Sequence, residues 1–326
     1  MFPLLRRLRP WVAAFVLSSL VLPAARTADR TPVSGQRTLI LGDSITQDGR
    51  YVAFLEYYLH RLSSGPASDL ISIGLGSETV SGLSEPGHPF PRPCVFTRLA
   101  DALGKVKPTV VLACYGMNDG IYLPPSPERL AAFERGLTEL ADKVRAAGAT
   151  LILITPPVFD PVPIAAKLAT PTVAPTGYQT PYAQYDDVLA EFARAGLQRR
   201  EQGLTVIDLH GAMAEELAAR RTGKPTFTFS PDGIHPNDLG HLLIARTVAR
   251  GLGLNPPGSP LEAELARIQA DPLFARVAER RALRSEAWLS FVGYTRGGVF
   301  KSGSVKAAEA VATRLQTEIE ALARNR

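Results

Sequence analysis

The sequence predicts an α/β fold built around a parallel β-sheet that is covered by helices on both faces. Short apolar runs alternate with longer amphipathic segments along most of the 326-residue chain. Strands that alternate with helices imply crossover connections, and continuous apolar strands imply burial on both faces. Hydrophobic residues make up 45% of the chain and charged residues 21%, which is typical of a globular protein with a large core.

Short apolar runs give the predicted strands. The first, residues 38–41, reads Thr-Leu-Ile-Leu and ends directly before a polar turn. Similar runs follow each helical stretch, and their β-branched residues favour extended backbone. In chain order the predicted strands are residues 38–41, 70–75, 109–115, 150–154 and 204–209.

Amphipathic segments between and after these runs give the predicted helices. Their apolar residues recur at helical spacing, so one stripe of each helix can face the sheet. Gly148 follows the third helix at a position where glycine commonly ends a helix. The predicted helices are residues 51–62, 95–103, 127–147, 182–200 and 238–251.

Two regions depart from this alternation. Residues 156–181 are rich in Pro, Thr and Ala, and so long a loop inside a compact domain is usually functional or disordered. The tail begins after Asn255 with Pro-Pro-Gly and contains two predicted helices, residues 261–285 and 305–324. We therefore expect a main domain over residues 30–255 and a helical C-terminal extension over residues 256–326 that packs on it.

The N-terminus has the composition of a secretory signal peptide. Arg6, Arg7 and Arg9 precede an apolar run, residues 11–22, and small residues follow up to Ala25. A membrane anchor is the alternative, but the run is shorter than the ~20 residues that a spanning helix needs. The sequence therefore predicts a signal peptide over residues 1–25, cleavage near Ala25, a secreted or periplasmic protein, and no stable membrane insertion after cleavage.

Charge and cysteine content exclude some functions. The net charge is +5, and the three N-terminal arginines account for three of these charges, so a nucleic-acid partner is not expected. The two cysteines, Cys94 and Cys114, form no cluster with histidines that suggests zinc, and no metal or cofactor is expected. Whether the two cysteines pair after export is left open, as is the oligomeric state.

Polar residues follow the first three predicted strands. Ser44 ends the triplet Gly-Asp-Ser after the first strand, Gly74 lies at the end of the second, and Asn118 follows the third in Gly-Met-Asn-Asp. Open parallel sheets bind ligands at the carboxyl ends of their strands, near the switch in strand order. We therefore expect these residues to meet in one crevice.

A histidine and an acid complete a possible acyl-transfer site. Asp232 and His235 lie three residues apart, just before the last helix of the main domain. The carboxylate can orient the imidazole through Nδ1, which leaves Nε2 to take the proton of Ser44. Backbone N–H groups of Ser44 and Gly74 and the side chain of Asn118 can supply an oxyanion hole. Each motif alone is also compatible with a turn or a helix cap, and the four together favour catalysis.

These blocks resemble those of the SGNH, or GDSL-type, hydrolase family: Gly-Asp-Ser-Ile-Thr, a glycine-bearing second block, Gly-Met-Asn-Asp and Asp-Gly-Ile-His, in the family's order. The resemblance covers residues 37–253. It implies a flavodoxin-like three-layer α/β/α sandwich with about five parallel strands and an esterase or acylhydrolase activity. It also implies Ser44 as nucleophile, His235 as base and Asp232 as its orienter, with Ser44, Gly74 and Asn118 forming the oxyanion hole.

The second block departs from the family pattern. Ser72 occupies the position, two residues before the glycine, where the family commonly has asparagine. Because of this departure, the family pattern alone does not decide whether Gly74 or Gly76 is the oxyanion glycine. The spacing to Glu78 and Thr79 favours Gly74.

The sequence thus predicts an exported serine esterase that hydrolyses short acyl esters, O-acetyl groups foremost, on a small molecule or a polysaccharide. A lipase, lysophospholipase or thioesterase is the alternative, with a groove built by Val158, Phe159 and Ile164. A glycan-binding module without catalysis is a further alternative. Trp288 and Arg296 in the tail either shape the pocket or brace the tail against the main domain.

Overall fold

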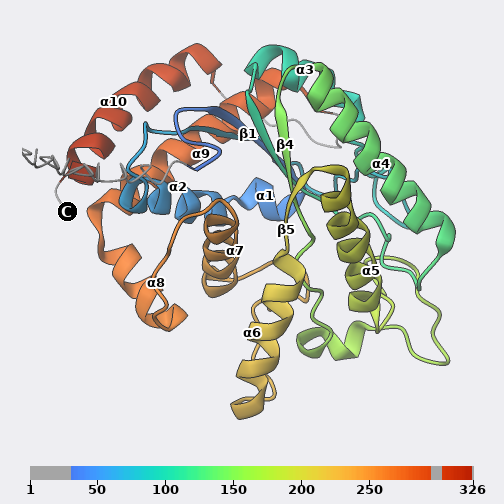
Figure 1. The fold of residues 1–326 in the computed structure, drawn as a ribbon. Coiled ribbons are helices and arrows are strands. Elements are labelled where there is room, and N and C mark those ends of the chain that lie inside the picture. The colour runs from blue at the N-terminus through green and yellow to red at the C-terminus, as the bar shows by residue number, and fades with distance from the viewer. Residues whose placement is uncertain (1–30, 295–302, 325–326) are drawn as a thin grey trace, which may run out of the picture.

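Figure 1 shows the computed structural model of the protein, which describes residues 31–294 and 303–324. At its centre is a five-stranded sheet in the order β2-β1-β3-β4-β5, with every neighbouring pair parallel. This order is that of flavodoxin-like folds, and both the predicted parallel sheet and its topology are confirmed. The strands are β1 (Arg37–Gly42), β2 (Asp69–Ser72), β3 (Val110–Cys114), β4 (Thr150–Ile154) and β5 (Thr205–Ile207).

Helices cover both faces of the sheet and create two separate hydrophobic cores. Ile40 of β1 points into one core, whereas its neighbours Leu39 and Leu41 point into the other, as alternation along a strand requires. The first core holds α2 (Arg50–Leu62), α6 (Leu209–Gly223) and α7 (Asp238–Gly251). The second holds α3 (Phe96–Val106), α4 (Pro127–Ala146) and α5 (Tyr185–Gln198). The three-layer architecture is therefore confirmed.

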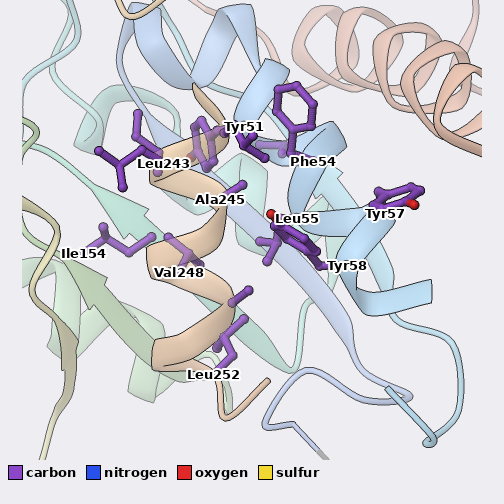
Figure 2. Close-up of a cluster of buried hydrophobic side chains, with 14 of the residues drawn as sticks. Tyr51, Phe54, Leu55, Tyr57, Tyr58, Ile154, Leu243, Ala245, Val248 and Leu252 are labelled. Atoms are coloured by element: carbon purple, nitrogen blue, oxygen red, sulfur yellow. The ribbon is translucent and has the colours of Figure 1, made fainter. Parts of the chain in front are cut away.

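Helices α2 and α7 form the centre of the first core. Figure 2 shows the side chain of Leu55 of α2 beside Ala245 and Val248 of α7. These side chains are at most 2% exposed. Because α2 follows the turn that carries Ser44 and α7 follows His235, this packing fixes the distance between the two turns.

The described C-terminal residues form three helices, of which the middle one lies against the β2 edge of the sheet. They are α8 (Leu261–Ala270), α9 (Pro272–Val292) and α10 (Val305–Arg324). Arg284 of α9 donates one hydrogen bond to the carbonyl of Leu70 at 2.8 Å and pairs with Asp69 at 2.7 Å. Arg280 pairs with Glu56 of α2 at 2.6 Å. The helix therefore covers an edge whose unpaired backbone groups would otherwise be exposed.

Several elements differ from the predicted ones. The single helix expected over residues 261–285 is two helices, because Asp271 caps the second at the N–H of Leu273 and Pro272 begins it. Helix α6 was not predicted. The long loop contains the short 3₁₀ helix η1 (Val162–Lys167), another, η2 (Arg199–Gln202), follows α5, and a one-turn helix, α1 (Ser44–Asp48), follows β1.

Some sequence predictions lie outside the described residues or stay predictions. The signal peptide, with its arginines and apolar run, falls within residues 1–30, and Arg296 falls within residues 295–302. The division of the chain at residue 255 also stays a prediction. None of the helices in the described ranges is both long and apolar enough to cross a membrane. Cys94 and Cys114 are not bonded to each other.

Candidate active site

Ser44 is the first residue of α1, directly after β1. The carboxylate of Asp43 accepts a hydrogen bond from the N–H of Ile45 at 2.9 Å and so caps this one-turn helix. Because β1 lies between β2 and β3 in the sheet, Ser44 lies at the carboxyl end of the strand where the strand order switches. The fold thus presents Ser44 where open α/β sheets bind their ligands.

His235 and Asp232 meet Ser44 from the loop before α7. Nε2 of His235 lies 2.8 Å from Oγ of Ser44, and Nδ1 lies 2.7 Å from Oδ2 of Asp232. The other oxygen of Asp232 accepts hydrogen bonds from the N–H groups of Ile234 and His235 at 3.0 and 2.7 Å. Gly233 permits this tight turn because its φ is +81°. The three side chains predicted to act together therefore form one hydrogen-bonded chain.

The pKa values of Asp232 and His235 suit proton transfer from Ser44. Burial acts to raise the pKa of Asp232, but hydrogen bonds from the ring and backbone of His235 and from Ile234 outweigh it and lower this pKa to about 2. The hydrogen bond to Asp232 raises the pKa of His235 above its ordinary value, against the opposing effect of burial. Asp232 is therefore ionised at neutral pH and strengthens His235 as a proton acceptor.

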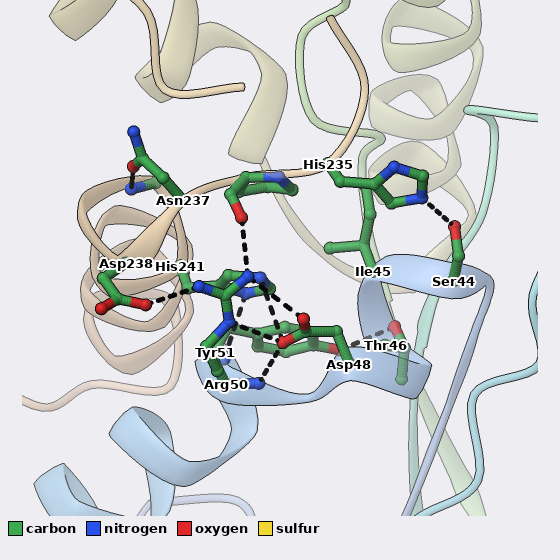
Figure 3. A network of polar contacts seen from close by, with 12 residues as sticks. Ser44, Ile45, Thr46, Asp48, Arg50, Tyr51, His235, Asn237, Asp238 and His241 are labelled. Atoms are coloured by element: carbon green, nitrogen blue, oxygen red, sulfur yellow. Dashed lines mark hydrogen bonds and ion pairs between the residues drawn. The ribbon is translucent and has the colours of Figure 1, made fainter. Parts of the chain in front are cut away.

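Arg50 joins the Ser44 turn to the His235 loop (Figure 3). Its guanidinium donates to the carbonyl of Pro236 at 3.0 Å and to Asp238 at 2.5 Å. The same group donates to Asp48, the last residue of α1, at 2.9 Å. One side chain thus links the helix that begins at Ser44 to the two residues that flank the start of α7.

Asn118 is 4% exposed and lies at the carboxyl end of β3, as predicted. Its Oδ1 accepts hydrogen bonds from Nη1 of Arg92 at 2.9 Å and from the hydroxyl of Tyr122 at 3.1 Å. Its Nδ2 donates to the carbonyl of Glu78 at 3.3 Å. An amide nitrogen carries two hydrogens, so Nδ2 has one left for a ligand in the pocket that Asn118 lines.

The second block is arranged differently from the prediction. The N–H groups of Ile73 and Leu75 donate to carbonyls of β1, so the intervening N–H of Gly74 points away from β1 and Ser44. A side chain at Gly74 would lie 2.3 Å from the backbone nitrogen of Gln47, so the glycine lets α1 pack closely. Gly74 does not line the pocket.

Ser77 takes the place in the pocket wall that the sequence assigned to Gly74. It lines the pocket and has a φ of +66°, a conformation rare for residues other than glycine. Gly76 also lines the pocket, but its N–H donates to the side chain of Gln47 at 2.7 Å. In the part of the chain that the structure describes, the N–H of Ser77 donates to no other residue, which leaves it free to bind a ligand.

These residues line an open pocket of about 390 Å³ above Ser44. Its walls combine polar groups of the site with aromatic rings from three loops, between β2 and α3, between β3 and α4, and between β4 and α5. The lining residues are Ser44, Gln47, Gly76, Ser77, His88, Pro89, Phe90, Arg92, Asn118, Tyr122, Tyr178, Ile234 and His235. A larger groove of about 660 Å³ between α4 and α5 contains none of the predicted site residues.

The other histidines of the chain lie away from the pocket, except for His88. His210 lies 3.4 Å from Asp186 and does not line the pocket. His60 and His241 are on helices α2 and α7, near Glu56 and Asp48 respectively. His88 lines the rim of the pocket beside Phe90 and Tyr178.

Two further features have structural roles. Asp119 is buried and accepts hydrogen bonds from the N–H groups of Val80 and Ser81, which anchors the loop after Ser77. Trp288 is 6% exposed and donates to Glu309 at 2.5 Å. It packs in the second core and does not line the pocket, which agrees with a bracing role for the tail.

Comparisons with known proteins agree with this architecture. The fold is similar to that of BT4096, a gut microbial diltiazem-metabolizing enzyme, with a TM-score of 0.53 and 19% identity, over 69% of this chain and 49% of that protein. The chain thus spans about half the length of BT4096. It is also similar to a catalytic mutant of Axe2, an acetylxylan esterase from Geobacillus stearothermophilus, with a TM-score of 0.51 and 20% identity, over 69% of this chain and 98% of Axe2. No curated protein matches the chain.

Family membership follows from the sequence itself. The profile of the GDSL-like lipase/acylhydrolase family matches residues 40–243, which is more than half of the chain. The match begins in β1 and ends in α7, so it includes every residue of the predicted site. The chain therefore belongs to the GDSL-like lipase/acylhydrolase family, a family of carboxylic ester hydrolases with the SGNH hydrolase fold.

Proposed function

We propose that this protein is an exported serine esterase that removes short acyl groups, O-acetyl groups foremost, from carbohydrate. The observation that carries the proposal is the hydrogen-bonded chain from Ser44 Oγ through His235 to Asp232, with distances of 2.8 and 2.7 Å, at the base of an open pocket. Such a chain activates a serine hydroxyl that is otherwise a poor nucleophile at neutral pH.

The reaction proceeds through an acyl-enzyme. Oγ of Ser44 attacks the ester carbonyl while Nε2 of His235 accepts the hydroxyl proton, and the ionised Asp232 stabilises the resulting imidazolium. The tetrahedral intermediate collapses when His235 returns this proton to the leaving alcohol. Water then attacks the acyl group with His235 again as base, which releases the acid and restores Ser44.

The oxyanion hole consists of donors that surround Ser44. The backbone N–H of Ser44, the backbone N–H of Ser77 and Nδ2 of Asn118 supply three hydrogen bonds to the developing negative charge. Ser77 replaces Gly74 of the sequence prediction, because Gly74 points away from Ser44. One such donor typically contributes ~3 kcal/mol to transition-state stabilisation.

The pH profile of kcat/KM is expected to have an acid limb with its midpoint above the ordinary histidine value of about 6.5. His235 must be neutral to accept the proton of Ser44, and the hydrogen bond to Asp232 raises the pKa of His235, so activity is lost as pH falls through this raised value. Burial raises the pKa of Asp43 to about 6, so its protonation falls on the same limb.

Asp43→Asn separates the two titrations in the pH profile. The asparagine oxygen can still cap α1 at the N–H of Ile45. The limb should therefore persist in this variant, with its midpoint slightly lower because one negative charge near His235 is gone. Rates that do not change between about pH 5 and 8 in both proteins would contradict the role of His235.

The lining of the pocket favours a substrate with a short acyl group and a carbohydrate alcohol. Its aromatic residues, among them Phe90, Tyr122 and Tyr178, offer apolar surfaces suited to sugar rings, and its polar groups suit hydroxyls. Val158 and Phe159, which the lipase alternative places in a lipid groove, are 2% and 1% exposed and packed in the cores. Axe2, which shares the fold, is an acetylxylan esterase.

Export is supported by the sequence. Arg6, Arg7 and Arg9, the apolar run of residues 11–22 and the small residues up to Ala25 have the order of a signal peptide. An exported esterase meets polysaccharides outside the cytoplasm. Mass determination of the N-terminus of the mature protein tests this part of the proposal, and an intact residue 1 would contradict it.

A chain-length series of aryl esters tests the substrate. We expect kcat/KM to be greatest for acyl groups of two to four carbons and at least roughly tenfold lower for ten carbons, because the described residues that line the pocket form no long apolar channel. A rise toward long chains would favour the lipase alternative instead. Binding of acetylated xylooligosaccharide without release of acetate would favour the glycan-binding alternative.

A further inference from the structure

A buried ion pair lies in the wall of the pocket, in the loop between β2 and α3. Nε and Nη2 of Arg92 each lie 2.6 Å from an oxygen of Glu85, and the two side chains are 2% and 1% exposed. The loss of hydration offsets most of the attraction in such a pair, so it contributes little net stability. A pair of this kind is well suited to holding its two side chains, and the groups that they contact, in one arrangement.

Arg92, together with the more distant carbonyl of Glu78, determines which way the Asn118 amide faces. An arginine only donates hydrogen bonds, so the amide atom 2.9 Å from its Nη1 has to be the oxygen. The hydroxyl of Tyr122 can donate or accept and therefore cannot decide the orientation alone. With Oδ1 held by Arg92, Nδ2 lies on the other side, where it donates to the carbonyl of Glu78 and keeps one hydrogen free.

The same pair connects two of the loops that form the pocket wall. Glu85 accepts a hydrogen bond from the backbone N–H of Tyr178 at 3.3 Å, which ties the loop before α5 to the loop before α3. The guanidinium of Arg92 lies 5.3 Å from the ring centre of Tyr122. Tyr122 has a φ of +58°, a strained conformation that the surrounding contacts must hold.

We propose that Arg92 is a positioning residue for the esterase reaction: it holds the Asn118 amide with Nδ2 toward the pocket, and Glu85 holds Arg92. This inference rests on the function proposed above. Arg92 acts through Asn118, whose hydrogen bond to the substrate oxygen strengthens as negative charge develops in the transition state. Its loss should therefore lower kcat and leave KM nearly unchanged.

The test replaces both members of the pair, Arg92→Met with Glu85→Gln, so that no unpaired charge is left buried. With an aryl acetate as substrate, we expect kcat to fall roughly 10- to 50-fold while KM changes less than about threefold. In an Asn118→Ala background, the same double replacement should lower kcat by less than about threefold, because its effect passes through the amide. Thermal unfolding and circular dichroism check the fold of each variant.

A matched control removes another buried pair. Arg280 and Glu56 lie 2.6 Å apart, are 8% and 1% exposed and do not line the pocket, so Arg280→Met with Glu56→Gln should keep the wild-type kcat. If the Arg92 double variant does not fold, Arg92→Lys replaces it in the cycle. One ammonium group cannot hold both Glu85 oxygens and Asn118, so kcat should again fall.

Two results would overturn the inference. One is a kcat within about twofold of wild type in the Arg92 variant, and the other is a fall of undiminished size in the Asn118→Ala background. If either result is found while Ser44→Ala and Asn118→Ala are both impaired, the role of Arg92 is rejected and the proposed function is not. Wild-type activity in Ser44→Ala and Asn118→Ala would instead reject the proposed function.

Discussion

Replacing Ser44 by alanine is expected to lower kcat for a short-chain aryl ester by about 10⁴-fold or more. In the proposed mechanism Ser44 Oγ forms the covalent bond to the acyl group, and it lies 2.8 Å from Nε2 of His235, the proposed base. Alanine removes only the hydroxyl group and leaves the cap by Asp43 in place, so the fold should be retained. Initial rates with p-nitrophenyl acetate, together with a thermal unfolding curve, measure both effects.

A control serine lies at the opposite end of the same strand. Ser34 precedes β1, and its hydroxyl donates to the carbonyl of Pro66 at an exposed position. Ser34→Ala should keep the wild-type kcat. Wild-type hydrolysis by Ser44→Ala, measured with the same substrate, would contradict the assignment of the nucleophile.

Replacing Asp232 by asparagine is expected to lower kcat by about 10³- to 10⁴-fold. The asparagine oxygen can still accept the N–H bonds of Ile234 and His235 that hold the turn. Its amide nitrogen then faces Nδ1 of His235 and cannot accept a proton from it. The imidazole is left in the wrong tautomer, with a hydrogen on the nitrogen that faces Ser44.

A second carboxylate–histidine pair offers the control for this variant. Asp186 lies 3.4 Å from His210 outside the pocket, and the same oxygen accepts the N–H of Phe159 at 2.7 Å. Asp186→Asn preserves that acceptor and should change kcat by less than about twofold. If both variants lost activity equally, the effect of Asp232→Asn would be structural, and the proposed role of Asp232 would be wrong.

Much of the architecture follows from local patterns in the sequence. The strands are short, apolar and separated by amphipathic helices, so their positions and the parallel sheet could be predicted. The meeting of Ser44 with His235, 191 residues later, could be predicted because both follow strands or precede helices at one edge of the sheet. Helix α6 was missed because its buried side chains form only a narrow stripe, Leu209, Met213 and Leu217 among them.

The proposed oxyanion residue, Ser77, differs from the predicted Gly74 because the decisive property is a backbone angle. Glycine is the residue type expected at such a position, but Gly74 is a glycine because α1 packs against it at close distance. Ser77 adopts a left-handed conformation without being a glycine, so residue type gave no sign of it. Only the direction of the backbone N–H groups distinguishes the two positions.

The pocket walls were missed for a different reason. Arg92, Phe90 and Tyr178 belong to loops without periodicity, and their positions depend on contacts between loops far apart in the sequence. The ion pair between Arg92 and Glu85 and its hydrogen bond to Asn118 are tertiary contacts of this kind. Sequence patterns report burial and local geometry, and these contacts follow from neither.

In the proposed mechanism, Ser44 carries the acyl group during turnover. This role is tested most directly by stopping a reaction with p-nitrophenyl acetate in acid and mapping the acetyl group by peptide mass spectrometry. We expect one acetyl group per chain on the peptide that contains Ser44, present in wild type and absent in Ser44→Ala. An active enzyme that carries no acetyl group, or that carries it on another residue, would show that Ser44 is not the nucleophile.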